Sequence, residues 1–317
     1  MPEIDLVCVA SWNVDLIAHV ASPLLRGQTQ MAHRFDRLPG GKGSNAAIAA
    51  ARQGARVGLI ARIGGDDMGR MGLDLWHREG IDARHVVQAP QEANGTALIL
   101  VFDDGDNSIA VYPGAGAGLS AGHVLAAREM LAACRVVMAS FEVPLDATLQ
   151  AFSLARQMGR FTLLNPAPAP AGGLPDALWP LIDVLTPNAG ELAALAGLDP
   201  SLTDAQSQAL AAAALLARGV GAVIVTRGSK GCCLYRPGQA PLALLGHAVP
   251  VTDTIGAGDT FSGALAAAMS RGLDLPAAMR WANAAAALSV ASHGAVTAMP
   301  KLAQVQALLN SGLSAPR

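Results

Sequence analysis

The stretch Asp253-Thr254-Ile255-Gly256-Ala257-Gly258-Asp259-Thr260-Phe261 is closely followed by the alanine-rich segment 264–269. Alanine favours helix, so the sequence predicts a glycine loop that leads into a helix. Gly256 and Gly258 let the backbone turn sharply, and the first helical turn then presents its N–H groups with the positive end of the helix dipole. Such a loop can act as an anion hole, and Asp259 would lie beside it. From this stretch alone, an N-terminal capping aspartate without chemistry is an equally good interpretation.

Around this loop the chain alternates short apolar strands with helices. Strands are predicted at 4–10, 56–63, 135–139, 160–164, 184–185 and 222–226, and helices at 44–53, 68–79 and 204–217. This alternation predicts an α/β fold, a three-layer α/β/α sandwich whose mostly parallel central sheet carries helices on both faces. Ligands of such sheets bind beyond the carboxyl ends of the strands, so the loops that follow the strands are the places to look for a site.

Two further stretches, at about 14–38 and 92–113, lack helical periodicity and are predicted to be extended strands. In the second stretch, the apolar segments 96–102 and 109–112 flank the polar turn 103–106, which is a hairpin signal. We expect the two stretches to form a small sheet separate from the main core. Since the chain shows no fixed-period repeat and no long linker, residues 1–317 are predicted to form one domain.

Polar groups near the N-terminus follow the first strand. Asn13 and Asp15 are two residues apart and share one face of an extended chain, which would suit a diol; an Asx turn is the alternative. The glycine loop at 39–45 leads into a helix, whose unpaired N–H groups would meet an oxygen-rich ligand. It is not a Walker A loop, because Gly43 rather than Ser or Thr follows Lys42, and a tight turn without a ligand also fits.

Two later loops also carry polar groups after strands. Asn188 and Glu191 lie at a predicted helix start, where they form either a capping box or a pair that orders a magnesium ion through water. The segment Thr-Arg-Gly-Ser-Lys-Gly at 226–231 could cradle a nucleotide, with a hairpin turn as the alternative. The shared placement of these loops after strands supports a common site.

Composition and charge exclude several classes of function. The chain has 317 residues, 52% apolar and 15% charged, with a net charge of −2 and a pI near 6.4. Lys and Arg do not cluster as they do in nucleic-acid-binding proteins. The chain lacks both the 18 or more consecutive apolar residues of a membrane span and the basic start of a signal peptide, so we expect a cytoplasmic protein without membrane contact. The cysteines at 8, 134, 232 and 233 are expected to be reduced thiols in buried strands.

Taken in order, these motifs resemble those of the ribokinase-like (PfkB) sugar kinases, and among them most closely those of the ribokinases. The motifs are Asn13-x-Asp15, Gly40-Gly41-Lys42-Gly43-x-Asn45, Asn165-Pro-Ala-Pro-Ala169, Thr186-Pro-Asn188-x-x-Glu191, Thr226-x-Gly228-x-x-Gly231 and residues 253–261. The resemblance extends from about residue 4 to about residue 300. It implies a central sheet flanked by helices, a small β-sheet lid over the substrate, and a homodimer in which the two lids clasp each other.

The resemblance also implies roles for individual residues. Asp259 would take the proton from a primary hydroxyl, beside an anion hole formed by Gly256, Ala257 and Gly258. The sugar would be held by Asn13, Asp15, Gly41, Lys42, Asn45 and Glu142. Mg-ATP would be ordered by Asn188 and Glu191, and the nucleotide lined by Thr226, Gly228, Ser229, Gly231, Gly258 and Asn283. A potassium ion would lie near Asp253, Ile255, Ser289, Ser292 and Gly294.

Three positions depart from the pattern of the family. Trp12 stands where ribokinases commonly carry a smaller residue, and would reshape either the sugar pocket or only its outer wall. Asn283 occupies a position that is often His beside the adenine. Ala298 replaces a frequent Ser near the implied potassium site, which weakens the case for the cation.

The activity that the resemblance implies is transfer of the γ-phosphoryl group of ATP to a primary hydroxyl of a small neutral sugar, with ribose first. A phosphorylated sugar would need cationic partners on the lid, and residues 94–118 contain no Lys or Arg. A nucleoside or another neutral sugar, as in fructokinases, is the runner-up, and Trp12 is the nearby candidate to stack on a nucleobase. A non-catalytic sugar-binding regulator is disfavoured by the intact Asp259. A nicotinamide-dependent oxidoreductase is disfavoured because the third glycine of the dinucleotide motif is missing.

Overall fold

A nine-stranded sheet forms the centre of the computed structural model, which describes residues 4–169 and 173–311. The strands follow the order β13-β12-β11-β10-β9-β8-β1-β4-β5. Pairing is parallel from β11 to β5, and β12 and β13 add to one edge in antiparallel fashion. The bounds are β1 (Leu6–Val9), β4 (Val57–Gly64), β5 (Asp82–Ala89), β8 (Val136–Ser140), β9 (Phe161–Asn165), β10 (Val184–Leu185), β11 (Ala222–Thr226), β12 (Cys232–Tyr235) and β13 (Leu242–Leu244). The predicted mostly parallel sheet is confirmed.

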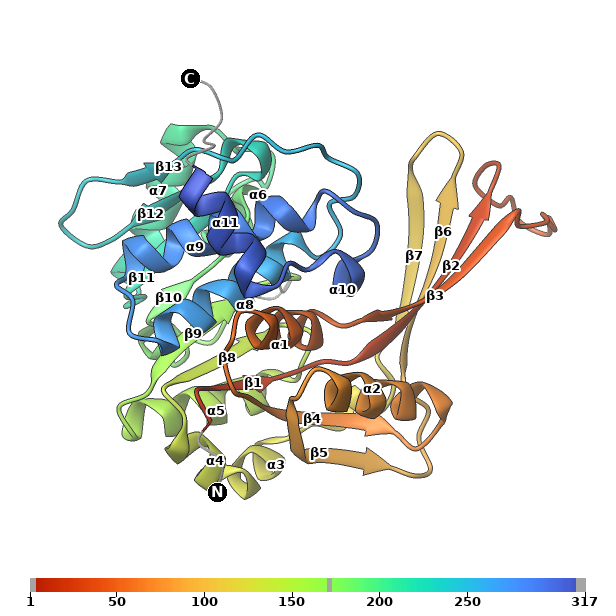
Figure 1. Cartoon of the computed structure of the whole chain (residues 1–317), viewed down its shortest axis with the longest axis horizontal. Helices are drawn as coiled ribbons and strands as arrows, with labels where there is room; N and C mark the ends of the chain where they lie inside the picture. Colours follow the sequence, from red (N-terminus) through yellow and green to blue (C-terminus); the bar gives the residue numbers. More distant parts are fainter. Residues whose placement is uncertain (1–3, 170–172, 312–317) are drawn as a thin grey trace.

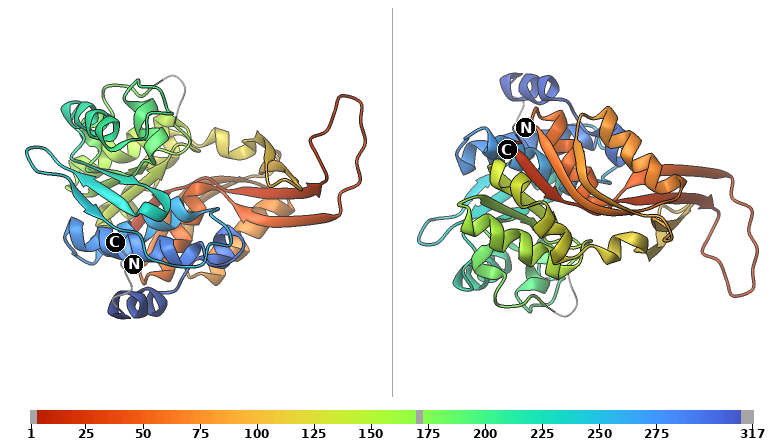
Figure 2. Two further views of the ribbon diagram at one scale, coloured as in Figure 1. Left: turned by 90° about the horizontal axis from the view of Figure 1, so that it is seen from above. Right: turned by 90° about the horizontal axis from the view of Figure 1, so that it is seen from below.

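Helices cover both faces of this sheet (Figure 2). The layer that packs on Leu6 and Cys8 contains α1 (Lys42–Arg52), α2 (Asp67–Arg78), α8 (Ala257–Ser270), α9 (Leu275–Ser289), α10 (Ala295–Ala298) and α11 (Leu302–Ser311). The layer that packs on Val7 and Val9 contains α3 (Ala121–Ala126), α4 (Arg128–Ala133), α5 (Leu145–Gln157), α6 (Ala189–Leu195) and α7 (Ala205–Ala217). Because successive strand residues point to opposite faces, the apolar run of β1 anchors both layers, as the sandwich prediction requires. The 3-10 helices are η1 (Gly114–Gly118), η2 (Trp179–Leu181) and η3 (Gly228–Lys230).

A second, four-stranded sheet projects from the body of the molecule (Figure 1). Its order is β3-β2-β6-β7, with bounds β2 (Asn13–Val20), β3 (Arg34–Gly40), β6 (Gly95–Phe102) and β7 (Asn107–Tyr112). The predicted hairpin is present as β6 and β7, and β2 joins it by parallel pairing with β6. We call this sheet the lid. Its strands occupy the two stretches that lack helical periodicity in the sequence.

Element boundaries differ from the sequence prediction by one or two residues. Helix α1 starts at Lys42 rather than at 44, because Gly41 adopts a φ of 92° and lets the chain turn directly from β3. The expectation that every cysteine lies in a strand is wrong for Cys134, which follows the last turn of α4. All four cysteines are buried and free, as predicted.

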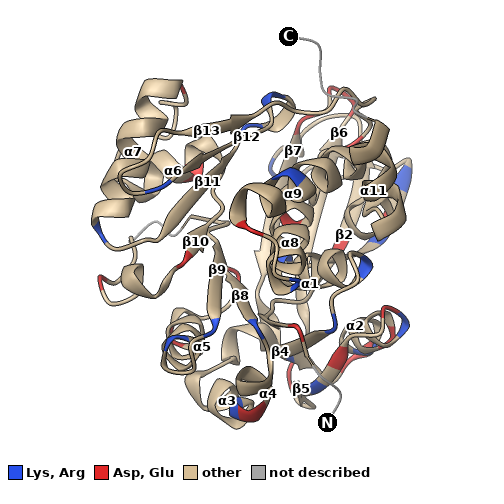
Figure 3. Cartoon of the chain, turned by 60° about the vertical axis from the view of Figure 1, so that its left-hand side comes forward, with Lys and Arg blue, Asp and Glu red and all other residues tan. Residues whose placement is uncertain are grey.

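Charge and hydropathy are distributed as in a globular domain. Lys and Arg appear on several separate elements in Figure 3 and do not gather on one of them. Within residues 4–169 and 173–311, no helix combines the length and the apolar character needed to cross a bilayer.

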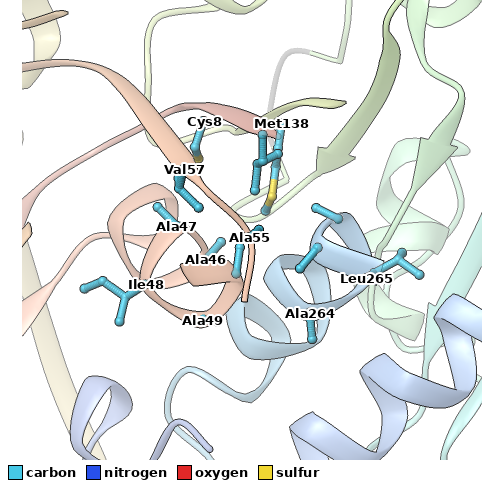
Figure 4. Packing of buried hydrophobic residues seen from close by; sticks show 14 of the residues in the cluster. Cys8, Ala46, Ala47, Ile48, Ala49, Ala55, Val57, Met138, Ala264 and Leu265 are labelled. Carbon is cyan, nitrogen blue, oxygen red and sulfur yellow. The ribbon is translucent and has the colours of Figure 1, made fainter. Parts of the chain in front are cut away.

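Helices α1 and α8 lie side by side at the centre of their layer (Figure 3), with small side chains between them. Figure 4 shows Ala46 and Ala49 of α1 near the middle of α8, where Ala264 and Leu265 lie. A Cβ atom built on Gly263 would lie 2.2 Å from the carbonyl oxygen of Ala46. The two helices can therefore approach this closely only because residue 263 is glycine.

The close contact of α1 and α8 predicts that Gly263→Ala destabilises the protein. The added methyl group must push apart two helix backbones, and overpacking of this kind costs about 1–3 kcal/mol. Chemical denaturation of the variant would measure the loss in the free energy of unfolding.

Gly122→Ala is the matched control, because the nearest atom to its added Cβ is the Ser120 hydroxyl at 3.6 Å. Alanine is the better helix former, so this variant should be as stable as the parent or more stable. Equal stability of the two variants would contradict the packing argument.

Candidate active site

Asp259 lies buried in the first turn of α8, below the glycine loop. Gly256 caps the helix with a φ of 74°, a conformation that favours glycine. A Cβ on Gly258 would meet no atom within 4 Å, so open space lies above the first turn. The backbone N–H of Ala257 donates a hydrogen bond to the carbonyl oxygen of Thr254 at 3.3 Å, within the loop itself. The helix start thus combines the positive end of the dipole with room for a ligand.

Two amide side chains hold the carboxylate of Asp259. Asn45 Nδ2 donates to its Oδ2 at 2.9 Å, and Asn165 Nδ2 donates to its Oδ1 at 3.4 Å. Asn45 belongs to the first turns of α1, and Asn165 ends β9. Asn45 is one of the predicted substrate residues. The sequence predicts no role for Asn165, and its position at the end of a strand is the signal that could have suggested one.

The two polar residues of β2 fit because glycines flank them. Asn13 pairs with Gly40 on β3 and with Gly95 on β6. A Cβ on Gly95 would lie 2.2 Å from Asn13 Oδ1, and one on Gly40 would lie 2.4 Å from Asp15 Oδ1. Glycines on β3 and β6, the two neighbours of β2, therefore leave space for these two side chains.

Glu142, which follows β8, is tied to the start of α1. Its Oε2 accepts hydrogen bonds from the Ser11 hydroxyl at 2.7 Å and from the Lys42 backbone N–H at 2.8 Å. The Ser11 hydroxyl in turn accepts from the backbone N–H of Gly43 at 3.2 Å. Ser11 had no predicted role. Its position directly after β1 could have suggested one.

Four carboxylates, those of Asp259, Glu142, Glu191 and Asp15, act electrostatically on Lys42. Burial opposes the charge of the ammonium group, but these carboxylates outweigh it and raise the pKa of Lys42. Four carboxyl groups thus act on one ammonium group, that of Lys42. The site therefore carries an excess of negative charge, which would favour a metal-bound rather than a free polyphosphate ligand.

Burial also affects the carboxyl groups of the site. It raises the pKa of Asp259 to about 6, against the opposing effects of Lys42 and of the Asn45 hydrogen bond. It raises the pKa of Asp15 to about 6, with a further increase from Glu142. The pKa of Glu191 is raised by burial as well. These groups have the perturbed proton affinity that is typical of functional sites.

Asn188 and Glu191 form the capping box that the sequence left open. Glu191 N–H donates to Asn188 Oδ1 at 2.8 Å, and Asn188 N–H donates to Glu191 Oε2 at 2.9 Å. Because Glu191 is also among the carboxylates that act on Lys42, the start of α6 faces the site. No group of three or more His, Cys, Asp or Glu side chains in the described part of the chain is arranged to hold a metal ion.

A cavity of about 580 Å³ opens on the other side of the glycine loop. Its lining includes predicted nucleotide residues, namely Thr226, Gly228, Ser229, Gly231, Gly258 and Asn283. Segment 226–231 is also the hairpin turn between β11 and β12 that the sequence left as an alternative. The remaining lining is mostly apolar and includes Val249, Phe261 and Ala286. A cavity of this size and composition suits a planar base.

Two of the predicted potassium residues, Ile255 and Gly294, contact a third, Asp253. Its Oδ1 accepts from the N–H of Ile255 at 2.9 Å, and its Oδ2 accepts from the N–H of Gly294 at 2.8 Å. Ser289 is buried at the end of α9 and donates to the Ala286 carbonyl. One carboxylate thus joins two loops whose main-chain oxygens are the ligand type that a hard cation prefers.

Trp12 does not line the candidate site. Its side chain is buried between β1 and α2, donates Nε1–H to the Met68 carbonyl at 2.9 Å and meets Trp76 edge to face. The prediction that Trp12 offers a stacking surface for a nucleobase is therefore wrong. Alternation explains this, because Trp12 points away from the face that carries Ser11 and Asn13.

Known proteins match nearly the whole chain. The family model described as pfkB family carbohydrate kinase matches residues 3–302. The chain is 35% identical to the ribokinase of Haemophilus influenzae, over 93% of this chain and 95% of that protein. It is 32% identical to the deoxyribokinase of Salmonella typhimurium, over 96% and 99% of the two chains. The solved structure of Arabidopsis thaliana ribokinase with ribose and ATP superposes with a TM-score of 0.89 at 30% identity, covering 97% and 99% of the chains.

The raised pKa of Asp259 predicts that Asp259→Asn stabilises the fold at neutral pH. A carboxyl group with a pKa of about 6 in the fold and 3.8 when free binds protons more tightly in the folded protein, so stability falls as pH rises from about 4 to 6. Above pH 6 the penalty is complete, on the order of 2–3 kcal/mol. The variant removes it, and denaturant unfolding at pH 8 and at pH 4 would measure the difference.

The gain should be present at pH 8 and largely absent at pH 4, where the parent carboxyl group is protonated. Asp74→Asn on the exposed face of α2 is the control and should change stability little at either pH. If Asp259→Asn were less stable than the parent at pH 8, the ionised Asp259 carboxylate would not destabilise the fold, and the prediction would be refuted.

Proposed function

Because the chain belongs to the PfkB family of carbohydrate kinases, we propose that it phosphorylates a primary hydroxyl of a small neutral sugar, with ribose as the first candidate. The chain is thus an ATP-dependent carbohydrate kinase, and the acceptor and the roles of its residues are the proposal. The observation that carries it is the position of Asp259. This buried carboxylate is held by Asn45 and acts electrostatically on Asp15 of β2, and its neighbours on α8, Gly258 and Phe261, line the cavity.

In the proposed reaction, Asp259 accepts the proton of the attacking hydroxyl. Two amide donors orient its carboxylate, and burial keeps its proton affinity high enough for a base near neutral pH. The start of α8, with Gly256 and Gly258, would stabilise the charge on the transferring phosphoryl group. Lys42 would add a positive charge on the sugar side of the same space.

ATP would occupy the 580 Å³ cavity, with the base against its apolar lining and the phosphates toward Gly258. A bound magnesium ion supplies charge neutralisation for the phosphates. Asn188 and Glu191 would order it through water. A potassium ion near the glycine turn would be held by Asp253, Ile255, Ser289, Ser292 and Gly294. The bound ion would stabilise the loop that forms the anion hole.

Several features support a neutral pentose as acceptor. Asn13, Asp15 and Glu142 offer acceptors and donors for hydroxyl groups, and the lid segment 94–118 lacks the cations that a sugar phosphate would require. Relatives named ribokinase and deoxyribokinase fit the same class. A nucleoside is the weaker alternative, because Trp12 is buried and offers no surface for a base.

We also propose that the lid mediates a homodimer. The face of the lid that carries Asp15 continues outward to Ile109 and Val111, which are 57% and 61% exposed. Cross-strand pairing places Ile109 beside Ile99 on this same face. An exposed apolar face next to a substrate site is a surface that a second copy of the chain would cover.

Asp259→Asn should lower turnover roughly 10²–10⁴-fold, the usual contribution of a general base. The assay follows ADP release with ribose, deoxyribose, fructose, adenosine and other nucleosides as acceptors. ATP binding should persist, because Asp259 is not among the residues that line the nucleotide cavity. Asp74→Asn is the control with parental kinetics. Near-normal turnover in the first variant would remove Asp259 as the base, and turnover by the parent with none of these acceptors would refute the sugar assignment.

Ile109→Lys should convert the proposed dimer into a monomer, since it places a charge in the apolar face that carries Asp15. Leu98→Lys is the matched control, because Leu98 is similarly exposed, at 56%, on the opposite face of the lid. Light scattering would give the mass of each variant. The choice of interface would be overturned if the parent were a monomer. It would also be overturned if Ile109→Lys remained a dimer while Leu98→Lys became a monomer.

A further inference from the structure

Arg52, the last residue of α1, makes four hydrogen bonds through one guanidinium group. Its Nη1 donates to the carbonyl oxygens of Val296 at 2.6 Å and Met299 at 3.0 Å. Its Nε and Nη2 donate to the carboxylate of Glu79 at 3.1 and 2.6 Å. The side chains of Arg52 and Glu79 are only 17% and 18% exposed. Such a bidentate and largely buried pair is more rigid than a surface salt bridge.

The backbone that Arg52 holds is the support of the glycine loop. A Cβ built on Gly256 would lie 2.8 Å from Ala295 Cβ and 3.8 Å from Met299 Cε. Segment 295–299 therefore packs directly against the turn that opens α8. The Asp253 carboxylate adds a second link, since it bonds to the N–H of Gly294. Arg52 contacts neither the loop nor the cavity, but it fixes the segment on which the loop rests.

The opposite end of the same helix forms the other side of the site. Helix α1 begins at Lys42, and its Asn45 donates to Asp259. Gln53, directly after Arg52, also binds this segment, because its Nε2–H donates to the Pro300 carbonyl at 2.7 Å. One helix thus orients the catalytic carboxylate at its start and anchors the support of the glycine loop at its end.

We propose that Arg52 is a positioning residue for phosphoryl transfer, which fixes the glycine loop relative to Asp259 through segment 295–299. The inference rests on the proposed function of this site. Only arginine can satisfy these partners, because its planar fork carries five donors in fixed directions, whereas a lysine head is a single point charge. Small displacements of a positioned group can reduce turnover by as much as about 10²-fold.

Arg52→Lys and Glu79→Gln separate positioning from general stabilisation. Lysine keeps the charge opposite Glu79 but cannot reach both main-chain carbonyls at once. Glutamine at 79 removes the ion pair but leaves the two carbonyl contacts of Arg52 in place. Both variants lose part of the same buried pair, so both should unfold at lower denaturant concentration than the parent.

The expected result is a roughly 10- to 100-fold fall in kcat for Arg52→Lys, with the KM for the sugar changed far less. Glu79→Gln should keep kcat within a few-fold of the parent. Hydrogen exchange of the backbone amides at 253–259 should be faster in Arg52→Lys than in the parent and unchanged in Glu79→Gln. This second readout does not depend on turnover.

Parental kcat in Arg52→Lys, or equal losses of kcat in the two variants, would overturn the proposal. Unchanged exchange at 253–259 in Arg52→Lys would do the same. If the parent itself turned over none of the sugars, the proposed function would fail, and the exchange comparison would still decide whether Arg52 fixes the loop.

Discussion

The close approach of α1 and α8 is the constraint on which the rest of this site depends. Gly263 and a row of alanines let the two helix backbones meet, and this contact sets the distance between the first turns of both helices. Asn45 then lies 2.9 Å from Asp259, although 214 positions separate them in the sequence. Small side chains here position a carboxylate rather than merely fill a core.

The electrostatics of the site oppose stability and favour chemistry. Four carboxylates share one buried ammonium group, and burial raises the pKa of Asp259 and Asp15 to about 6. A fold selected for stability alone would have no reason to hold this excess charge. Other contacts offset the free-energy cost of this buried charge. They include the hydrogen bonds of two amides to Asp259 and the buried pair of Arg52 with Glu79.

Two motifs with a confirmed structural role also lie next to the candidate site. Asn188 and Glu191 do cap α6, and they also face the charged site. Segment 226–231 is a hairpin turn, and it lines the cavity as well. Capping and turn chemistry place N–H groups and carboxylates at the carboxyl ends of strands. In an α/β sheet this is also where ligands bind, so structural and functional roles coincide.

The sequence by itself determined the fold class, the lid strands and the loops that form the site, because strand and helix periodicity and glycine turns are local properties of the chain. It did not reveal that Trp12 is buried, that Ser11 and Asn165 join the site, or that Arg52 supports the glycine loop. Each of these depends on which side of a strand a residue faces or on contacts between residues 32 to 247 positions apart. Only tertiary packing decides such contacts, because nothing in a local pattern specifies the partner.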